Sequence, residues 1–213
     1  RRLRKNDALI ICGDFGFIWN GSRKEKKILK RLGKKRYNVL FVEGCHENFD
    51  LLEEYEVEEW CGGKTRKISG RLRQLMRGQV YEIAGKRIFT FGGGHSDKDD
   101  WYPEEGKNWW KREAPNEQEL AEGTETLLAC GNRVDFIVTH EPPAMINEFI
   151  NGQVEERSRI STYLDKIRES AAYERWFFGK LHLNKLVPPK YHGLFTAVIY
   201  ADKTKIKKKK EKN

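Results

Sequence analysis

Short runs of apolar, strand-forming residues alternate along this chain with amphipathic segments. Runs that are mostly apolar are typical of strands covered on both faces, and they occupy residues 8–12, 39–43, 134–139 and 176–178. Two further runs at 79–83 and 87–91 flank a short turn and predict a hairpin. We also predict a final strand at 194–200.

Helix signals separate these strands. Ser22 and Glu25 are spaced as a capping box, so we predict a helix from there to about residue 35. A second capping-box pair, Asn116 and Glu119, predicts a helix to about residue 130. Apolar residues at helical spacing predict another helix from about residue 160, and residues 49–60 read as a short acidic helix. The strand–helix–strand unit at the start predicts parallel neighbouring strands.

Charge and length define the organisation. We predict one domain over residues 1–202, long enough to bury a core, followed by a disordered lysine-rich tail at 203–213. The net charge is +9, but the tail carries +6 and residues 1–5 carry +4, which leaves about −1 for the body. A solvated tail is therefore favoured over a groove for a nucleic-acid backbone.

The four cysteines are scattered and form no CxxC pair, which favours a reduced, cytoplasmic setting. The longest apolar runs are far below the roughly 20 residues needed to cross a bilayer, so we expect no membrane association.

Polar residues follow four of the predicted strands. Asp14 follows the first, Cys45 and His46 the second, and His140 the third, while Lys180 and His182 follow the fourth. Ligands collect beyond the carboxyl ends of strands in α/β sheets, so this placement predicts chemistry there. Cys45 and His46 do not form a nucleophilic pair, because adjacent residues of an extended strand end point to opposite sides.

Taken singly, the short motifs exclude more than they establish. The GDFG at 13–16 lacks the other kinase motifs, and His140-Glu141 lacks the second histidine of a HExxH zinc site. No helix is predicted directly after the glycines at 92–94, which excludes a dinucleotide-binding loop at this place.

The order of these motifs is more specific than any one of them. GD, then GxHE, then a strand ending in TH, then FFGxxH resembles the calcineurin-like metallophosphoesterase family over nearly the whole chain. The resemblance implies an α/β fold in which a double β-sheet sandwich of mixed sheets is flanked by helices (αββα). It also implies two divalent metal ions of the Mn, Fe or Zn type.

Site roles follow from the same resemblance. Asp14 would bridge both metals, His140 would bind the second metal and His182 the first, and His46 would stand beside the scissile phosphate. Two cations about 3.5–4 Å apart acidify a bridging water and neutralise phosphoryl oxygens. A histidine such as His46 would protonate the leaving oxygen or stabilise its charge. Glu47 either orients His46 or forms a surface salt bridge.

Three positions depart from the family pattern. The Asp-x-His of its first motif is absent, and we expect it in a segment upstream of Arg1. Cys45 replaces an amide ligand and Lys180 replaces a ligand histidine. A thiolate would favour zinc, whereas an ammonium repels a dication. Lys180 would therefore either bind phosphate directly in place of the second metal or mark a decayed site.

The long segment at 92–115 exceeds the roughly 12–15 residues of an ordinary connection. It is either a substrate lid, to which His95 and Asp97 would contribute, or a surface loop pinned by Trp101, Trp109 and Trp110. The sequence leaves both open.

We therefore predict a metal-dependent hydrolase of a phosphomonoester or phosphodiester, whose substrate is a phosphorylated small molecule, a nucleotide or a phosphoprotein. The alternative is a non-catalytic relative that holds phosphate or a partner without turnover. A nucleic-acid partner bound through the tail is a weaker third hypothesis.

Overall fold

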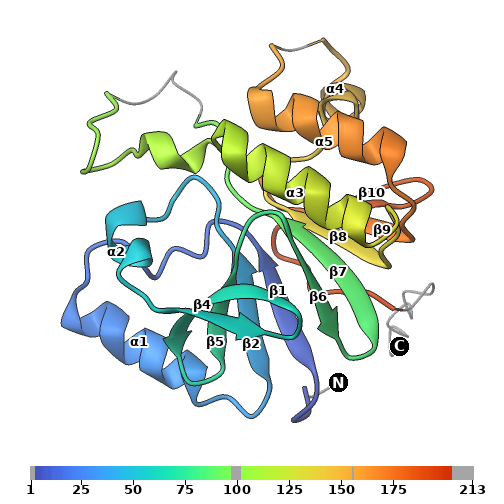
Figure 1. Cartoon of the computed structure of the whole chain (residues 1–213). Helices are drawn as coiled ribbons and strands as arrows, with labels where there is room; N and C mark the ends of the chain where they lie inside the picture. The colour runs from blue at the N-terminus through green and yellow to red at the C-terminus, as the bar shows by residue number, and fades with distance from the viewer. Residues whose placement is uncertain (1–2, 97–101, 155, 203–213) are drawn as a thin grey trace, which may run out of the picture.

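The computed structural model describes residues 3–96, 102–154 and 156–202. Their strands form two mixed sheets (Figure 1). The first sheet has the order β1-β2-β5-β4-β3. Its strands are β1 (Ala8–Cys12), β2 (Asn38–Val42), β3 (Val57–Trp60), β4 (Gly63–Ser69) and β5 (Leu72–Leu75).

The second sheet has the order β10-β11-β9-β8-β7-β6. Its strands are β6 (Gln79–Ile83), β7 (Lys86–Phe91), β8 (Phe136–Thr139), β9 (Arg175–Phe178), β10 (Lys185–Val187) and β11 (Tyr191–Gly193). The predicted hairpin is confirmed as the antiparallel pair β6 and β7. β7, β8 and β9 run parallel, so their carboxyl ends meet at one edge.

Helices cover the outer faces of both sheets (Figure 1). On the first sheet lie α1 (Arg23–Gly33) and α2 (Phe49–Glu53), and on the second lie α3 (Glu117–Ala129), α4 (Ala144–Asn151) and α5 (Arg159–Ser170). A short 3-10 helix, η2 (Lys111–Glu113), precedes α3. The architecture is the predicted double sheet flanked by helices.

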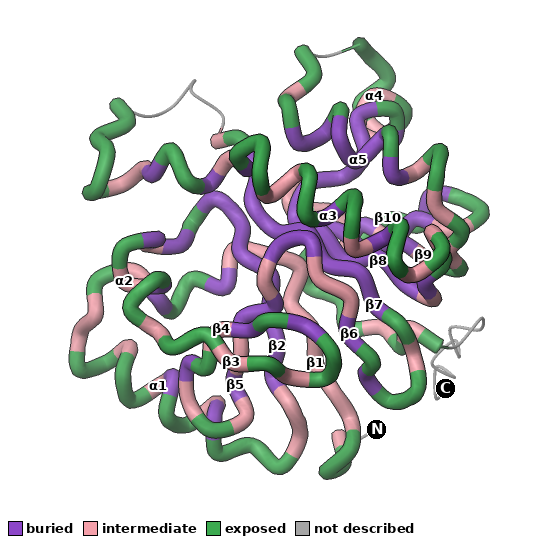
Figure 2. The backbone as a smooth tube through the Cα atoms, viewed as in Figure 1, coloured by how far each residue is buried: buried purple, intermediate pink, exposed green. Residues whose placement is uncertain are grey.

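The alternation of side chains along the strands explains why their apolar runs are continuous. In β8, Phe136 and Val138 join the cluster between the two sheets, whereas Ile137 joins the cluster under α3, α4 and α5. In β2, Leu40 faces the other sheet and Phe41 faces α1 and α2. Both faces of these strands are covered, so buried residues concentrate in the central strands (Figure 2).

Both predicted caps begin helices. The Ser22 side chain accepts a hydrogen bond from the Glu25 amide, and Asn116 forms a full capping box with Glu119. At the first cap the Glu25 carboxylate reaches further back than the motif requires. It accepts from the amides of 19–21 rather than from that of Ser22, and so orders the loop that precedes α1.

The predicted strand at 194–200 is wrong. The chain there is irregular, and the Asn184 side chain accepts from the amides of Phe195 and Ala197. Two of the amides that a strand would have offered to a neighbour are therefore bound by a side chain. The strands of this region are instead β10 and β11, which lie before it.

Two other predictions need correction. The helix predicted at 49–60 ends at Glu53, because its second half is β3, which pairs with β4. β1 is a strand as predicted, parallel to β2, but its five residues are only half-buried. It stands at the edge of its sheet, so it has one neighbouring strand rather than two.

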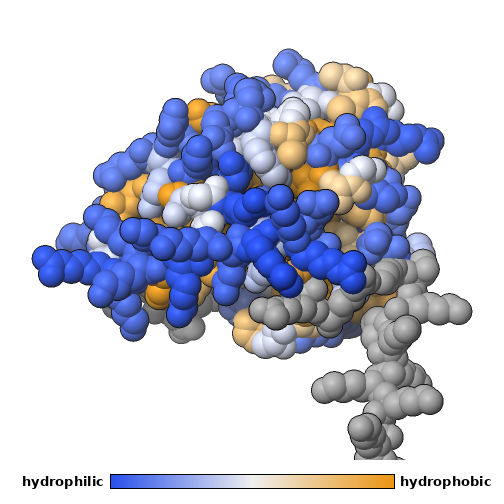
Figure 3. Space-filling model, turned by 90° about the horizontal axis from the view of Figure 1, so that it is seen from below, coloured by the Kyte–Doolittle hydropathy of each residue, from blue (hydrophilic) through white to orange (hydrophobic). Residues whose placement is uncertain are grey.

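The face seen from below carries hydrophilic residues over most of its area, with smaller hydrophobic areas between them (Figure 3). Among the described helices, none is long and apolar enough to cross a membrane. The lysine-rich tail lies outside the described residues.

Replacement of Leu40 by alanine should lower the free energy of unfolding by about 2–5 kcal/mol, because Leu40 is fully buried between the two sheets. Leu128→Ala is the matched control, since Leu128 is 59% exposed and should change stability by less than about 0.5 kcal/mol. Chemical denaturation followed by circular dichroism measures both. Equal effects of the two substitutions would contradict the assignment of the inter-sheet core.

Candidate functional site

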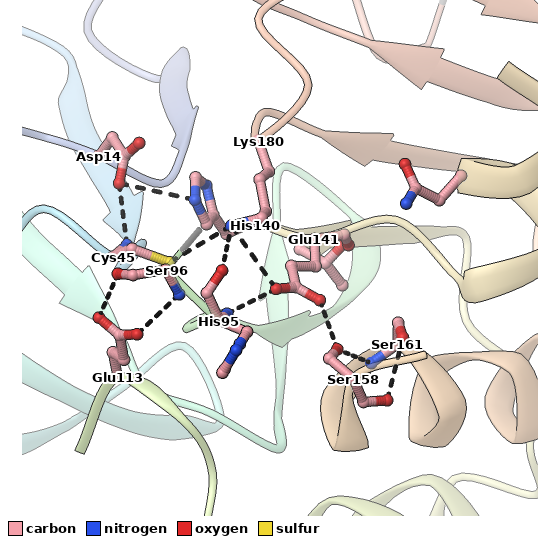
Figure 4. A network of polar contacts seen from close by, with 12 residues as sticks. Asp14, Cys45, His95, Ser96, Glu113, His140, Glu141, Ser158, Ser161 and Lys180 are labelled. Carbon is pink, nitrogen blue, oxygen red and sulfur yellow. Dashed lines mark hydrogen bonds and ion pairs between the residues drawn. The ribbon is translucent and has the colours of Figure 1, made fainter. Parts of the chain in front are cut away.

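The carboxyl ends of β1, β2, β7, β8 and β9 converge at one edge of the sandwich (Figure 4). The loops that follow them bring together Asp14, Cys45, His95, His140 and Lys180. The sequence therefore placed most of its candidate residues correctly at strand ends, and the sandwich supplies their proximity.

Asp14 is held by backbone donors from the neighbouring strand end. Its Oδ1 atom accepts from the amides of Cys45 at 2.9 Å and His46 at 3.0 Å. Gly44 permits this approach, since a Cβ there would stand 2.2 Å from Oδ1. Burial alone would raise the pKa of Asp14, but the rings of His140 and His46 and the two amides together lower it. The carboxylate is therefore ionised at neutral pH.

His140 is 2% exposed, and its ring orientation is set by a backbone carbonyl. Nδ1 lies 3.0 Å from the Cys12 carbonyl oxygen, which can only accept, so Nδ1 carries the proton and Nε2 carries the lone pair. Nε2 faces Asp14 Oδ1 at 3.5 Å. Burial lowers the pKa of His140, which favours this neutral form. Two electron-pair donors thus face each other, an arrangement that a cation between them would stabilise.

His46 is exposed, so its ring is accessible from solvent. Glu47, by contrast, is fully buried, so the expectation of a surface salt bridge is wrong. Its two oxygens accept from the amides of Phe15 at 2.5 Å and Gly44 at 2.7 Å. Burial, followed by the charge of Asp14, raises the pKa of Glu47 to about 8. This side chain therefore connects the Asp14 loop to the loop after β2, and an orienting role towards His46 stays a prediction.

Lys180 lies within the cluster. Its Nζ donates to the His95 carbonyl oxygen and lies 3.8 Å from both Cys45 Sγ and Glu141 Oε1 (Figure 4). Its amide also donates to the His140 carbonyl oxygen at 3.0 Å. Burial raises the pKa of the Cys45 thiol well above its usual value, although Lys180 opposes this shift. Cys45 is therefore a neutral thiol beside an ammonium group.

Two buried glutamates in the site were not among the predicted residues. Glu141 accepts from the His95 amide at 2.6 Å and from the Ser158 hydroxyl at 2.9 Å. Burial raises the pKa of Glu141, with Lys180 opposing. Glu113 is 1% exposed and binds the amide and hydroxyl of Ser96. The position of Glu141 directly after His140 was the only sequence signal for either.

A buried ion pair supports the site from behind. Arg77 Nε donates to Glu43 Oε1 at 2.5 Å, and Glu43 precedes Gly44 in the chain. The same guanidinium donates to the Glu113 carbonyl oxygen at 3.0 Å, which also accepts from the Gly94 amide. Arg77 therefore joins the loop after β2 to the loop after β7.

The other candidates lie at the margin or beyond the described residues. His182 is exposed, in a left-handed conformation at φ 48°, and its ring stands 5.1 Å from that of Phe195. No described contact joins His182 to Asp14 or His140, so its role as a ligand stays a prediction. Asp97 and Trp101 lie outside the described residues.

Within the described part of the long loop, one tryptophan is packed. Trp110 is 1% exposed, its Nε1 donates to Asp50 at 2.8 Å, and its ring meets Trp19 edge-on. His95 is exposed, and its backbone binds Glu141 and Lys180. The hypothesis of a pinned loop therefore holds at Trp110, while a lid role for His95 stays a prediction.

The donor set matches the implied metals only in part. Asp14 and His140 fit one divalent cation, because a lone pair and a carboxylate oxygen face each other with nothing else bound between them among the described contacts. No group of three or more His, Cys, Asp and Glu side chains placed to hold a metal occurs within the described ranges. Near Cys45, the ammonium of Lys180 opposes a second cation.

A search of curated proteins finds none that matches this chain. A scan against models of protein families matches residues 1–188 to the calcineurin-like phosphoesterases. The matched segment includes the strands from β1 to β10, and it covers far more than half of the chain. With this match and the double sheet flanked by helices, the chain belongs to the calcineurin-like phosphoesterase family.

Proposed function

We propose that this chain is a metal-dependent phosphoesterase that hydrolyses a phosphomonoester or phosphodiester. The observation that carries the proposal is the pair formed by Asp14 Oδ1 and the lone pair of His140 Nε2, 3.5 Å apart and open to a cation. A divalent cation held there would polarise a phosphoryl oxygen and acidify a water. Mn, Fe or Zn suits the imidazole ligand better than Mg does.

The residues around this pair have separate tasks. The backbone amide of His46 donates to Asp14 Oδ1, and the exposed ring of His46 can reach a substrate from solvent. We assign it the transfer of a proton to the leaving oxygen. Lys180 supplies a positive charge 3.8 Å from Cys45 Sγ, and we assign it the binding of a phosphoryl oxygen. In this arrangement Lys180 replaces part of the charge that a second metal would bring.

A second candidate function has an observation in its favour. The described residues offer only Asp14 and His140 as facing ligands, which is fewer than structural or catalytic metal sites usually have. The same crevice would then bind a phosphorylated molecule through Lys180 and His46 without turnover. Metal content separates the two functions.

Elemental analysis after incubation with Mn²⁺ or Zn²⁺ and removal of excess ion should find about one metal per chain. Asp14→Asn should lose it, because the substitution removes the charged ligand while it keeps the side-chain shape. Asn48→Asp, which adds a carboxylate at the cap of α2, is a control for charge that should not alter the content. Absence of metal from the unchanged chain would favour the non-catalytic function.

His46→Gln should lower kcat for an aryl phosphate in Mn²⁺ by about 10²-fold, within the range for loss of a general acid. The loss should grow as the leaving group becomes more basic, because a poor leaving group depends more on protonation. Comparison of a nitrophenyl ester with an alkyl ester provides the internal control. Identical rates for the variant and the unchanged enzyme across this series would exclude the role of His46.

Lys180→His and Lys180→Met form a matched pair, since both remove the ammonium and its bond to the His95 carbonyl oxygen. Lys180→His should raise the metal content towards two per chain, because it replaces a repelling charge with a ligand. Lys180→Met should leave the content unchanged and raise KM about tenfold through loss of a charged contact to phosphate. An unchanged KM in Lys180→Met would contradict phosphate binding by Lys180.

A further inference from the structure

A cavity of about 610 Å³ lies apart from the Asp14 and His140 pair, on the outer face of the first sheet. Its walls come from α2, the ends of β2 and β5, η2 and the start of α3. We use the term catalytic cluster for Asp14, Cys45, His140 and Lys180, none of which lines this cavity. Glu43 and Arg77, which support the cluster from behind, do line it. Its volume is within the range of about 300–1,000 Å³ that is typical of sites for small molecules.

The wall contains a buried acceptor that no described protein group satisfies. Gln74 is 4% exposed, and its Nε2 donates to Glu43 Oε2 at 2.8 Å. Glu43 forms an ion pair with Arg77, so its carboxylate is ionised and can only accept hydrogen bonds. The group of Gln74 that faces Glu43 must therefore be the NH₂ group, and Oε1 points the other way. Gln74 Oε1 is left without a hydrogen bond from the described residues. A buried acceptor in this state favours a donor from a bound molecule.

The charges that line the cavity favour an anion. Each of its four carboxylates has a cationic partner: Arg77 binds Glu43 and Glu119, Arg112 binds Glu53, and Arg159 binds Glu117. Two further cations, Arg66 and Lys111, form no ion pair with any carboxylate of the described ranges. Five cations thus line the cavity against four carboxylates, which gives the lining a formal charge of +1, although Arg112 also pairs with Asp50 outside it.

Arg66 and the unsatisfied acceptor are neighbours. Arg66 on β4 pairs directly with Gln74 on β5, so their side chains leave the same face of the sheet. Arg66 Nη1 donates to the carbonyl oxygens of Glu53 at 3.4 Å and Tyr55 at 3.3 Å, which are long hydrogen bonds. The side chains of Phe49, Leu52 and Met76 supply an apolar wall beside them.

We propose that this cavity is a second ligand site, for a small phosphate-bearing molecule that also carries an N–H donor. The donor binds Gln74 Oε1, the phosphate binds Arg66 and Lys111, and the flat or apolar part of the molecule packs on Phe49 and Met76. The site is independent of the catalytic cluster and does not rest on the proposed hydrolysis.

Adenosine 5′-monophosphate is the probe, because it combines a phosphate with an exocyclic amino donor. The full chain is titrated by calorimetry in EDTA, so that metal-dependent binding at the catalytic cluster does not contribute. Purine riboside 5′-monophosphate, which lacks the amino group, should bind about five- to tenfold more weakly, as expected for loss of one buried hydrogen bond. Inorganic phosphate alone should bind more weakly still.

Two substitutions test the residues separately. Gln74→Leu should remove the difference between the two nucleotides, and Arg66→Gln, at a half-buried position on β4, should weaken both by about tenfold. Lys30→Ala removes an exposed cation of α1 outside the cavity and should change neither. Lys180→Met should leave the difference in affinity between the two nucleotides unchanged, because Lys180 does not line the cavity.

The proposal is overturned if neither nucleotide binds, or if Lys180→Met weakens binding while Arg66→Gln does not. Equal affinity of the unchanged chain for both nucleotides would also overturn it, since water would then satisfy Gln74 Oε1. Thermal unfolding of each variant without ligand shows whether it is folded. If Gln74→Leu does not fold, Arg66→Gln still tests the proposal.

Discussion

Two hydrogen bonds from backbone amides to the carboxylate of Asp14 organise this site. Asp14 follows β1 in a left-handed conformation at φ 49°. Its side chain accepts hydrogen bonds from two backbone amides in the loop after β2. This contact requires the two strands to be parallel, in register and followed by a glycine, because any Cβ at Gly44 would collide with the carboxylate. Once the carboxylate is fixed, His140 from the other sheet completes the pair. The candidate metal ligands are thus a product of how the two sheets pack.

The buried carboxyl groups around this contact each have hydrogen-bond partners. Glu47 binds two amides beneath Asp14, Glu113 binds Ser96, and Arg77 links Glu43 to the loop after β7. A buried charge without such partners would cost several kcal/mol, so these bonds determine where the loops can lie. Lys180 fits the same logic, because its ammonium lies among the Glu141 carboxylate, the Cys45 sulfur and a carbonyl oxygen. A lysine in this place brings a positive charge to the position where the family resemblance implies a histidine ligand of the second metal.

Local signals predicted much of the fold. The capping residues Ser22 and Asn116 begin helices as expected, and the apolar runs are strands because their two faces meet different clusters. The prediction of secondary structure failed where a contact with a distant segment favoured a different conformation from the one that the local pattern indicated. Apolar residues at 194–200 read as a strand, yet the Asn184 side chain takes two of the amides. Polar residues at 57–60 read as helix, yet they form an edge strand against β4 because a neighbour was available.

For the site, the sequence determined which residue types stand near the strand ends, since Asp14, His46, His140 and Lys180 each lie within four residues of the end of an apolar run. Only the tertiary structure decided how these residues lie relative to one another. Glu47 and Glu113 carry no sequence signal that separates a buried support from a surface charge, because burial depends on segments distant in the chain. The proton position on His140 depends on the Cys12 carbonyl oxygen, 128 residues away in the chain. Strand ends are local properties of a sequence, whereas the facing of two ligands is a property of the packing of two sheets.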